Sequence, residues 1–157
     1  MGAYQELVLT CNLKEDCPQQ VVDLLNYMFQ VDKSITHETN NPEAPDHEFF
    51  RINEDEWKWF LEDTYYFPGE IFAKLTHDQF GFYKCTLRTM LKYGDEMVAT
   101  FLDWLLPYIR DEGFIGYTRS DEDPEIDLIY FEEGAVFYEE IQMWNTLPTI
   151  KRRKISK

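Results

Sequence analysis

The sequence predicts an α+β fold, a mostly antiparallel sheet with two main helices packed on one face plus a short extra helix. Stretches in which apolar and polar residues alternate lie near the N-terminus and again after residue 70, and this alternation is typical of half-buried strands. Two other stretches, residues 18–30 and 94–106, repeat apolar residues at helical spacing. Because strands and helices are segregated along the chain, their order favours an antiparallel sheet with helices on one face.

Residues 5–13 predict the first strand, whose core side carries Leu7, Leu9 and Cys11. The first helix follows at Pro18, because the fixed φ of proline suits the first helical turn. Its apolar stripe consists of Val21, Leu24, Leu25 and Met28.

The next segment predicts little regular structure. Residues 31–48 are polar, contain two prolines and predict a long loop. A short strand or turn near residues 49–52 then leads into a short helix that carries Trp57, Phe60 and Leu61 on one face.

The middle of the chain predicts two strands and a helix. Residues 70–78 and 80–92 form the strands, joined by a turn. The helix over residues 94–106 ends at Pro107, whose ring clashes with the preceding helical turn. The core side of the second strand consists of Tyr83, Cys85 and Leu87.

The C-terminal part predicts a meander of three strands over residues 113–119, 125–131 and 135–141. A Glu-Gly pair joins the last two strands, because glycine supplies the positive φ of a two-residue turn. The resulting register pairs Phe131 with Val136 and Tyr130 with Phe137.

We expect residues 1–150 to form a single α+β domain and residues 151–157, KRRKISK, to form a basic flexible tail. The other interpretation of the tail is an end that folds back on the acidic body. The whole chain has a net charge of −15, and the part before the tail has ten basic and thirty acidic residues. Such a field repels nucleic acid and attracts basic proteins, so we expect no direct nucleic-acid binding by the body and a basic protein partner.

Several observations predict a cytoplasmic protein with reduced thiols and no membrane association. The three cysteines have no metal-ligand spacing, residues 1–15 do not resemble a signal peptide, and no stretch is apolar enough to span a membrane. Cys11 and Cys85 fall on core sides of predicted strands. Cys17 lies at a helix start, where the pKa of a thiol can fall.

The stretch SDEDPEIDLIYFEEGAVFYEE, residues 120–140, carries nine carboxylates and no basic side chain. We interpret it first as the solvated face of a hairpin, because charge runs at turns are well hydrated. The second interpretation is a docking surface for a basic partner. A calcium loop does not fit, because the stretch lacks spaced acids around a central glycine. The acids of the docking interpretation are Asp121, Glu122, Asp123, Glu132 and Glu133.

The run WKWFLEDTYYFPG is the most unusual local feature. We expect it to be a lid over a sheet that the two helices do not fully cover, anchored by Trp57 and Phe60. The alternative is an acid-rimmed aromatic groove for a cationic or peptide ligand. Trp59 and one of Tyr65 or Tyr66 then point away from the core.

The sequence contains no phosphate-binding glycine loop and no nucleophile motif, so it provides no candidate catalytic residue, metal site or cofactor. We therefore expect a non-enzymatic acidic protein-binding or inhibitory module that docks a basic partner. The alternative is a small-ligand-binding protein or enzyme that uses His37 and His47 of the 31–48 loop and the 57–67 aromatic run. A structural role within a larger assembly is a third interpretation. The expected partner-binding residues are Trp59, Tyr65, Tyr66, Asp121, Glu122, Asp123, Glu132 and Glu133.

Overall fold

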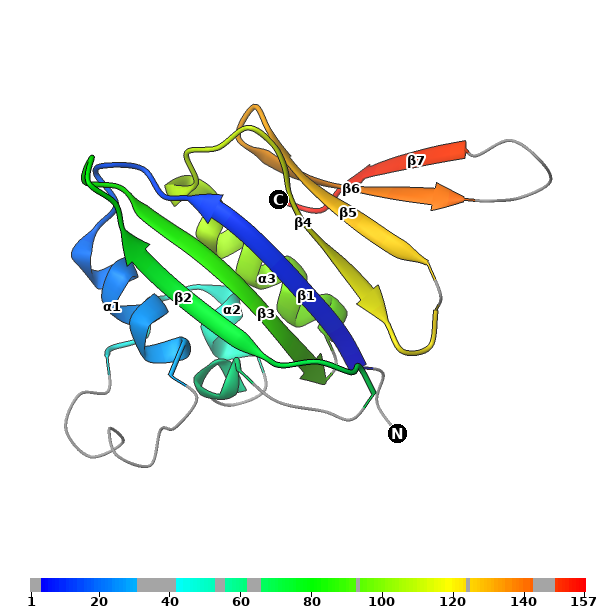
Figure 1. Ribbon diagram of the computed structural model, residues 1–157, viewed down its shortest axis with the longest axis horizontal. Helices are drawn as coiled ribbons and strands as arrows, with labels where there is room; N and C mark the ends of the chain where they lie inside the picture. The colour runs from blue at the N-terminus through cyan, green and yellow to red at the C-terminus, as the bar shows by residue number, and fades with distance from the viewer. Residues whose placement is uncertain are drawn as a thin grey trace.

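The computed structural model describes residues 4–30, 42–52, 56–61, 66–92, 94–123, 125–142 and 149–157. Within these ranges, seven strands form one antiparallel sheet in the order β2-β3-β1-β4-β5-β6-β7 (Figure 1). The strands are β1 (Tyr4–Asn12), β2 (Phe72–His77), β3 (Tyr83–Lys92), β4 (Gly113–Ser120), β5 (Ile126–Glu132), β6 (Ala135–Gln142) and β7 (Thr149–Lys154). The helices are α1 (Gln19–Met28), α2 (Glu48–Arg51) and α3 (Gly94–Leu105), with short 3-10 helices η1 (Glu56–Trp59) and η2 (Leu106–Tyr108).

The helices lie on one face of the sheet, which confirms the predicted α+β class (Figure 1). α3 contacts β1 and β3, and α1 contacts β2. β1 is central, because the β2–β3 hairpin adds to one side of it and the β4 to β7 meander adds to the other. The opposite face of the sheet carries no helix among the described elements, which are therefore arranged in two layers.

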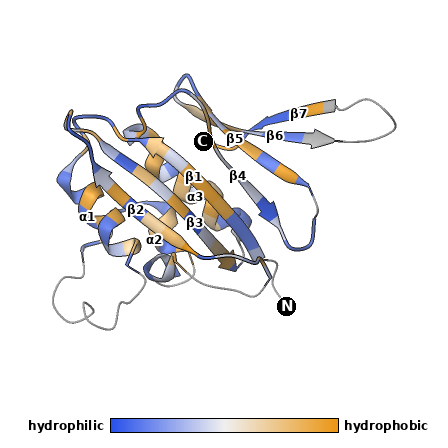
Figure 2. Ribbon diagram, in the orientation of Figure 1, coloured by the Kyte–Doolittle hydropathy of each residue, from blue (hydrophilic) through white to orange (hydrophobic). Residues whose placement is uncertain are grey.

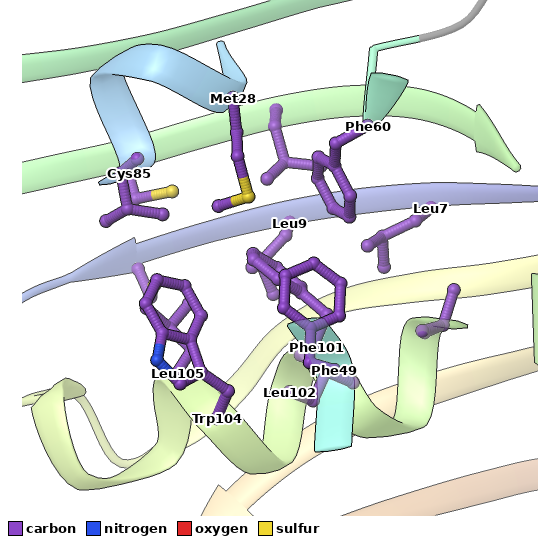
Figure 3. Close-up of a cluster of buried hydrophobic side chains, with 14 of the residues drawn as sticks. Leu7, Leu9, Met28, Phe49, Phe60, Cys85, Phe101, Leu102, Trp104 and Leu105 are labelled. Carbon is purple, nitrogen blue, oxygen red and sulfur yellow. The ribbon is translucent and has the colours of Figure 1, made fainter. Parts of the chain in front are cut away.

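The core fills the space between the sheet and the helices (Figure 3). Leu7 and Leu9 of β1 are fully buried there, as their alternation predicts. Phe49 of α2 packs against Phe101 and Trp104 of α3, with ring centroids 5.4 and 5.9 Å apart. Trp57 and Phe60 are also buried, as expected of the two residues that anchor the aromatic run.

The turn between β5 and β6 has the predicted register. Glu133 and Gly134 adopt φ of 50° and 75°, the left-handed conformation that a two-residue hairpin turn requires. Consequently Phe131 pairs with Val136, and Tyr130 pairs with Phe137.

The segment near residues 49–52, predicted as a strand or turn, is instead the one-turn helix α2. The His47 ring accepts a hydrogen bond from the Phe49 backbone N–H at 3.2 Å and so caps this helix. Burial of Phe49 and Phe50 against other aromatic rings, which local sequence does not show, holds the turn in place.

The basic C-terminal segment also differs from the expected flexible tail. Residues Thr149–Lys154 are strand β7, paired antiparallel with β6 along its length. The Ile155 N–H donates to the Val136 carbonyl at 2.9 Å, and Ser156 is buried. The end of the chain therefore folds back on the acidic hairpin, as the other interpretation of the tail predicts.

Candidate functional site

Four of the predicted partner-binding residues come together at the turn between β4 and β5. Tyr66, Asp121, Glu122 and Asp123 line one hollow of about 500 Å³. Figure 2 shows that this turn is hydrophilic along its described length. The remaining lining includes apolar side chains, so a ligand would meet both charge and aromatic surface there. The other five lining residues are Phe67, Pro68, Arg119, Ser120 and Ile126.

The other predicted residues lie elsewhere. β5 begins beside this hollow and runs away from it, so Glu132 and Glu133 lie at the opposite end of the strand (Figure 1). Trp59 is 58% exposed and lines a separate hollow of about 200 Å³. Tyr65 lies outside the described residues. The predicted set is therefore divided between separate regions, and the β4–β5 turn holds the largest group.

A second hollow, of about 440 Å³, shares Arg119, Ser120, Glu122 and Asp123 with the first. It extends toward the first turn of α3, and six carboxylates and two guanidinium groups line it. We call it the acidic hollow. Its carboxylates are Asp95, Glu122, Asp123, Glu125, Asp127 and Glu140, and its guanidinium groups are Arg119 and Arg153.

Hydrogen bonds from backbone N–H groups to carboxylates fix the turn between β4 and β5. The Asp121 carboxylate accepts a hydrogen bond from the Tyr4 N–H at 2.7 Å, which ties the turn to the start of β1. The Asp123 carboxylate accepts from the Glu125 N–H at 3.0 Å, as acidic residues in turns commonly do. Asp121 and Asp123 therefore shape the turn as well as adding charge.

Aromatic rings also line the first hollow. Tyr66 is 39% exposed and stacks on Tyr4, with ring centroids 4.7 Å apart. The Arg119 guanidinium lies over the Phe67 ring at 4.9 Å. Tyr66 is thus the member of the aromatic run that contributes to this site.

Both guanidinium groups of the acidic hollow already have acidic partners. Arg119 donates to the Glu6 carboxylate, and Arg153 lies 3.6 Å from Asp127. Because these charges are compensated locally, the remaining carboxylates dominate the potential of the hollow.

Glu6 was not predicted as a site residue, yet it organises this part of the sheet. Its side chain is 1% exposed and also accepts from Arg88 Nε at 2.6 Å. Arg88 in turn donates to the carbonyls of Pro68 and Glu70, which holds the segment after Tyr66 on the uncovered face. Alternation in β1 places Glu6 opposite the core side, but only strand pairing brings the two arginines to it.

Like charges crowd one another in the acidic hollow. The pKa of Glu125 is raised to about 7, first because its side chain shares a hydrogen bond with Glu140 and then because of desolvation and the negative charge of Glu140. Burial raises the pKa of Asp127 above its usual range, against the opposing effect of Arg153. A cation placed here would relieve this repulsion.

Of the two loop histidines in the rival interpretation, the structure describes His47, which makes contacts between helices. His47 caps α2 and its Nε2 lies 3.4 Å from Asp103 of α3, so it links two helices. His37 lies outside the described residues. In the part of the chain that the structure describes, no group of three or more His, Cys, Asp or Glu side chains is placed to hold a metal ion.

The cysteines differ from expectation at one position. Cys11 and Cys85 are buried, as predicted. The pKa of Cys17 is raised to about 11, by burial and then by the negative charge of Asp16, so the decrease that a helix start can cause is not found. The helix effect does not prevail because Cys17 lies before the first helical turn, next to a carboxylate.

No described helix combines the length and apolar character needed to cross a bilayer. Comparisons with protein-family models, with curated proteins and with solved structures found no match to the chain.

Proposed function

We propose that the protein is a non-enzymatic binding module that docks a basic segment of a partner protein at the β4–β5 turn. The observation that carries this proposal is the acidic hollow, which six carboxylates and two guanidinium groups line. Arg153 pairs with one of these carboxylates, Asp127, and Arg119 pairs with Glu6 outside the hollow, so the carboxylates of the lining are in excess over its guanidinium groups. A lysine or arginine side chain of a partner would supply the missing positive charge. An inhibitory role follows where the docked segment is one that the partner needs for its own activity.

Binding would proceed in two physical stages. The net charge of −15 attracts a basic partner over long range, which raises the association rate at low salt. Close contact then buries exposed apolar surface beside the acids, and aromatic anchors carry much of the energy of protein interfaces. Tyr66 and Ile126, 39% and 43% exposed, are the available anchors in the neighbouring hollow.

The test uses a fluorescent oligolysine peptide and fluorescence anisotropy at low and high salt. The variant Glu122→Gln with Glu125→Gln removes two carboxyl groups from the acidic hollow. The matched control, Glu15→Gln with Asp16→Asn, removes two charges from the exposed turn before α1. We expect roughly tenfold weaker binding for the first pair and less than about twofold for the second, because close charges contribute more than distant ones.

Two outcomes would contradict the proposal. Equal losses for both pairs would show that only the net charge of the chain matters. Binding that persists unchanged at high salt would show that the carboxylates do not provide the attraction. Thermal unfolding of each variant verifies that the fold is retained.

A further inference from the structure

The acidic hairpin of β5 and β6 already holds a basic strand, the protein's own β7. Among the six residues of β7, four are lysine or arginine, and they run antiparallel to the acid-rich end of β6. In this register Glu139 lies opposite Arg152, and Glu140 lies opposite Lys151. Strand pairing thus sets two of the four basic residues opposite acids, and the other two, Arg153 and Lys154, opposite Tyr138 and Phe137.

Arg152 is held by charge and by aromatic rings at the same time. Its guanidinium lies 2.7 Å from Glu132 and 3.5 Å from Glu139. It also lies over the Phe137 ring at 4.3 Å and the Tyr130 ring at 5.9 Å. Two carboxylates beside two rings make a receptor suited to a planar guanidinium.

Arg153 has a comparable arrangement on the other face of the sheet. Successive strand residues point to opposite faces, so it cannot share the site of Arg152. It lies over the Tyr138 ring at 5.1 Å and 3.6 Å from Asp127. The hairpin therefore recognises two neighbouring arginines of an extended strand, one from each face.

β7 is placed so that another extended segment could replace it beside β6. It is the last strand of the sheet and pairs only with β6. Residues 150–154 are all exposed, and Ile150 is 67% exposed, so little apolar surface is buried along the strand. Strands with few buried apolar contacts open at low free-energy cost relative to the core.

We propose that the β5–β6 hairpin is a binding surface for an extended, arginine-rich segment of a partner protein, and that β7 occupies this surface in cis. Recognition would combine main-chain hydrogen bonds to the edge of β6 with the two arginine receptors, as in strand addition to a sheet. The inference shares with the proposed function the basic character of the partner and one pair of residues, because Arg153 and Asp127 also line the acidic hollow. Its main carboxylates, Glu132 and Glu139, do not line the acidic hollow.

A partner segment must compete with β7 for the surface of the hairpin. A tethered segment competes with an effective concentration of about millimolar, so a free copy of the same segment binds the intact protein weakly. Weakening β7 without altering its receptor should therefore strengthen binding from solution. Weakening the receptor should abolish it, although both changes break the same ion pairs.

The experiment measures binding of a labelled peptide of residues 149–157, TIKRRKISK, to full-length variants by anisotropy. Arg152→Gln with Arg153→Gln weakens the cis strand, and we expect it to bind the peptide at least about fivefold more tightly than the natural chain. Adding Glu132→Gln and Glu139→Gln to this variant should remove the gain. The matched control, Lys151→Gln with Lys154→Gln, lowers the charge of β7 equally and should change binding by less than about twofold.

Further peptide and variant measurements test the two arginine receptors. A peptide carrying glutamine in place of both arginines should fail to bind, and binding of this peptide would overturn the arginine receptors. No gain in the double arginine variant, or a gain that survives the glutamate substitutions, would also overturn the proposal. Sedimentation that shows dimers would identify a second copy, and not a partner protein, as the occupant.

The two proposals fail separately. Substitutions at Glu122 and Glu125 test the acidic hollow with oligolysine, whereas those at Glu132 and Glu139 test the hairpin with the arginine peptide. Loss of one binding event with retention of the other shows which surface is responsible.

Discussion

The sheet contains two ion networks of opposite composition. At its centre, one carboxylate, Glu6, is shared by Arg88 and Arg119. At its edge, one guanidinium, Arg152, is shared by Glu132 and Glu139. The Glu6 side chain is 1% exposed, whereas that of Arg152 is 37% exposed.

This difference in burial gives the two networks different roles: the Glu6 network is structural, and the Arg152 network can break and re-form. A buried charge depends on its partners, because water cannot replace them when one is removed. A charge that remains in contact with water loses little when its partner leaves. The central network therefore fixes β3, β1 and β4 together with the segment that carries Tyr66, while the edge network can open without unfolding the core.

The largest expected effect follows from Glu6→Gln. The substitution leaves two guanidinium groups without their shared carboxylate, and loss of one partner of a buried pair costs about 3–5 kcal/mol. Arg119 is 36% exposed and Arg88 keeps its bonds to two carbonyls, so we expect a value at the lower end, about 3 kcal/mol. Urea unfolding measures it. A loss below about 1 kcal/mol would show that the network is not structural.

A smaller effect is expected from Arg152→Gln. Its ion pairs are partly exposed, so the free energy of unfolding should fall by about 1 kcal/mol or less. Amide hydrogen exchange should increase in β7 and stay unchanged in β1, because the edge strand opens locally. Equal acceleration in both strands would contradict the distinction between the two networks.

The same contrast explains how far the sequence predicted the structure. The β5–β6 turn was predictable because the Glu-Gly pair and its flanking residues specify it locally. β7 was not, because a run of lysine and arginine favours a strand here only through the carboxylates of β5 and β6. The Glu6 network depends in the same way on residues far apart in sequence, Arg88 and Arg119.

The candidate site was predicted in part for the same reason. Asp121, Glu122 and Asp123 are neighbours in sequence, so their grouping needed no knowledge of the fold. Tyr66 joins them through the segment that Arg88 holds, which no local pattern shows. Glu132 belongs to the edge network and not to this site, because β5 separates the two ends of the acidic stretch.

In the acidic hollow, the side chains of Glu125 and Glu140 share a hydrogen bond, and this carboxylate pair gives the smallest expected effect. The pKa of Glu125 is raised to about 7, so this group is ionised in the unfolded chain from about pH 4.5 and in the folded chain only near pH 7. Between these values the unfolded state releases its proton more readily, so the contribution of Glu125 to stability decreases as pH rises and is constant above pH 7. Binding of oligolysine should change in the opposite direction and strengthen over the same range. Glu125→Gln should remove both dependences while Glu139→Gln keeps them, and an NMR titration giving Glu125 its ordinary pKa would contradict this assignment.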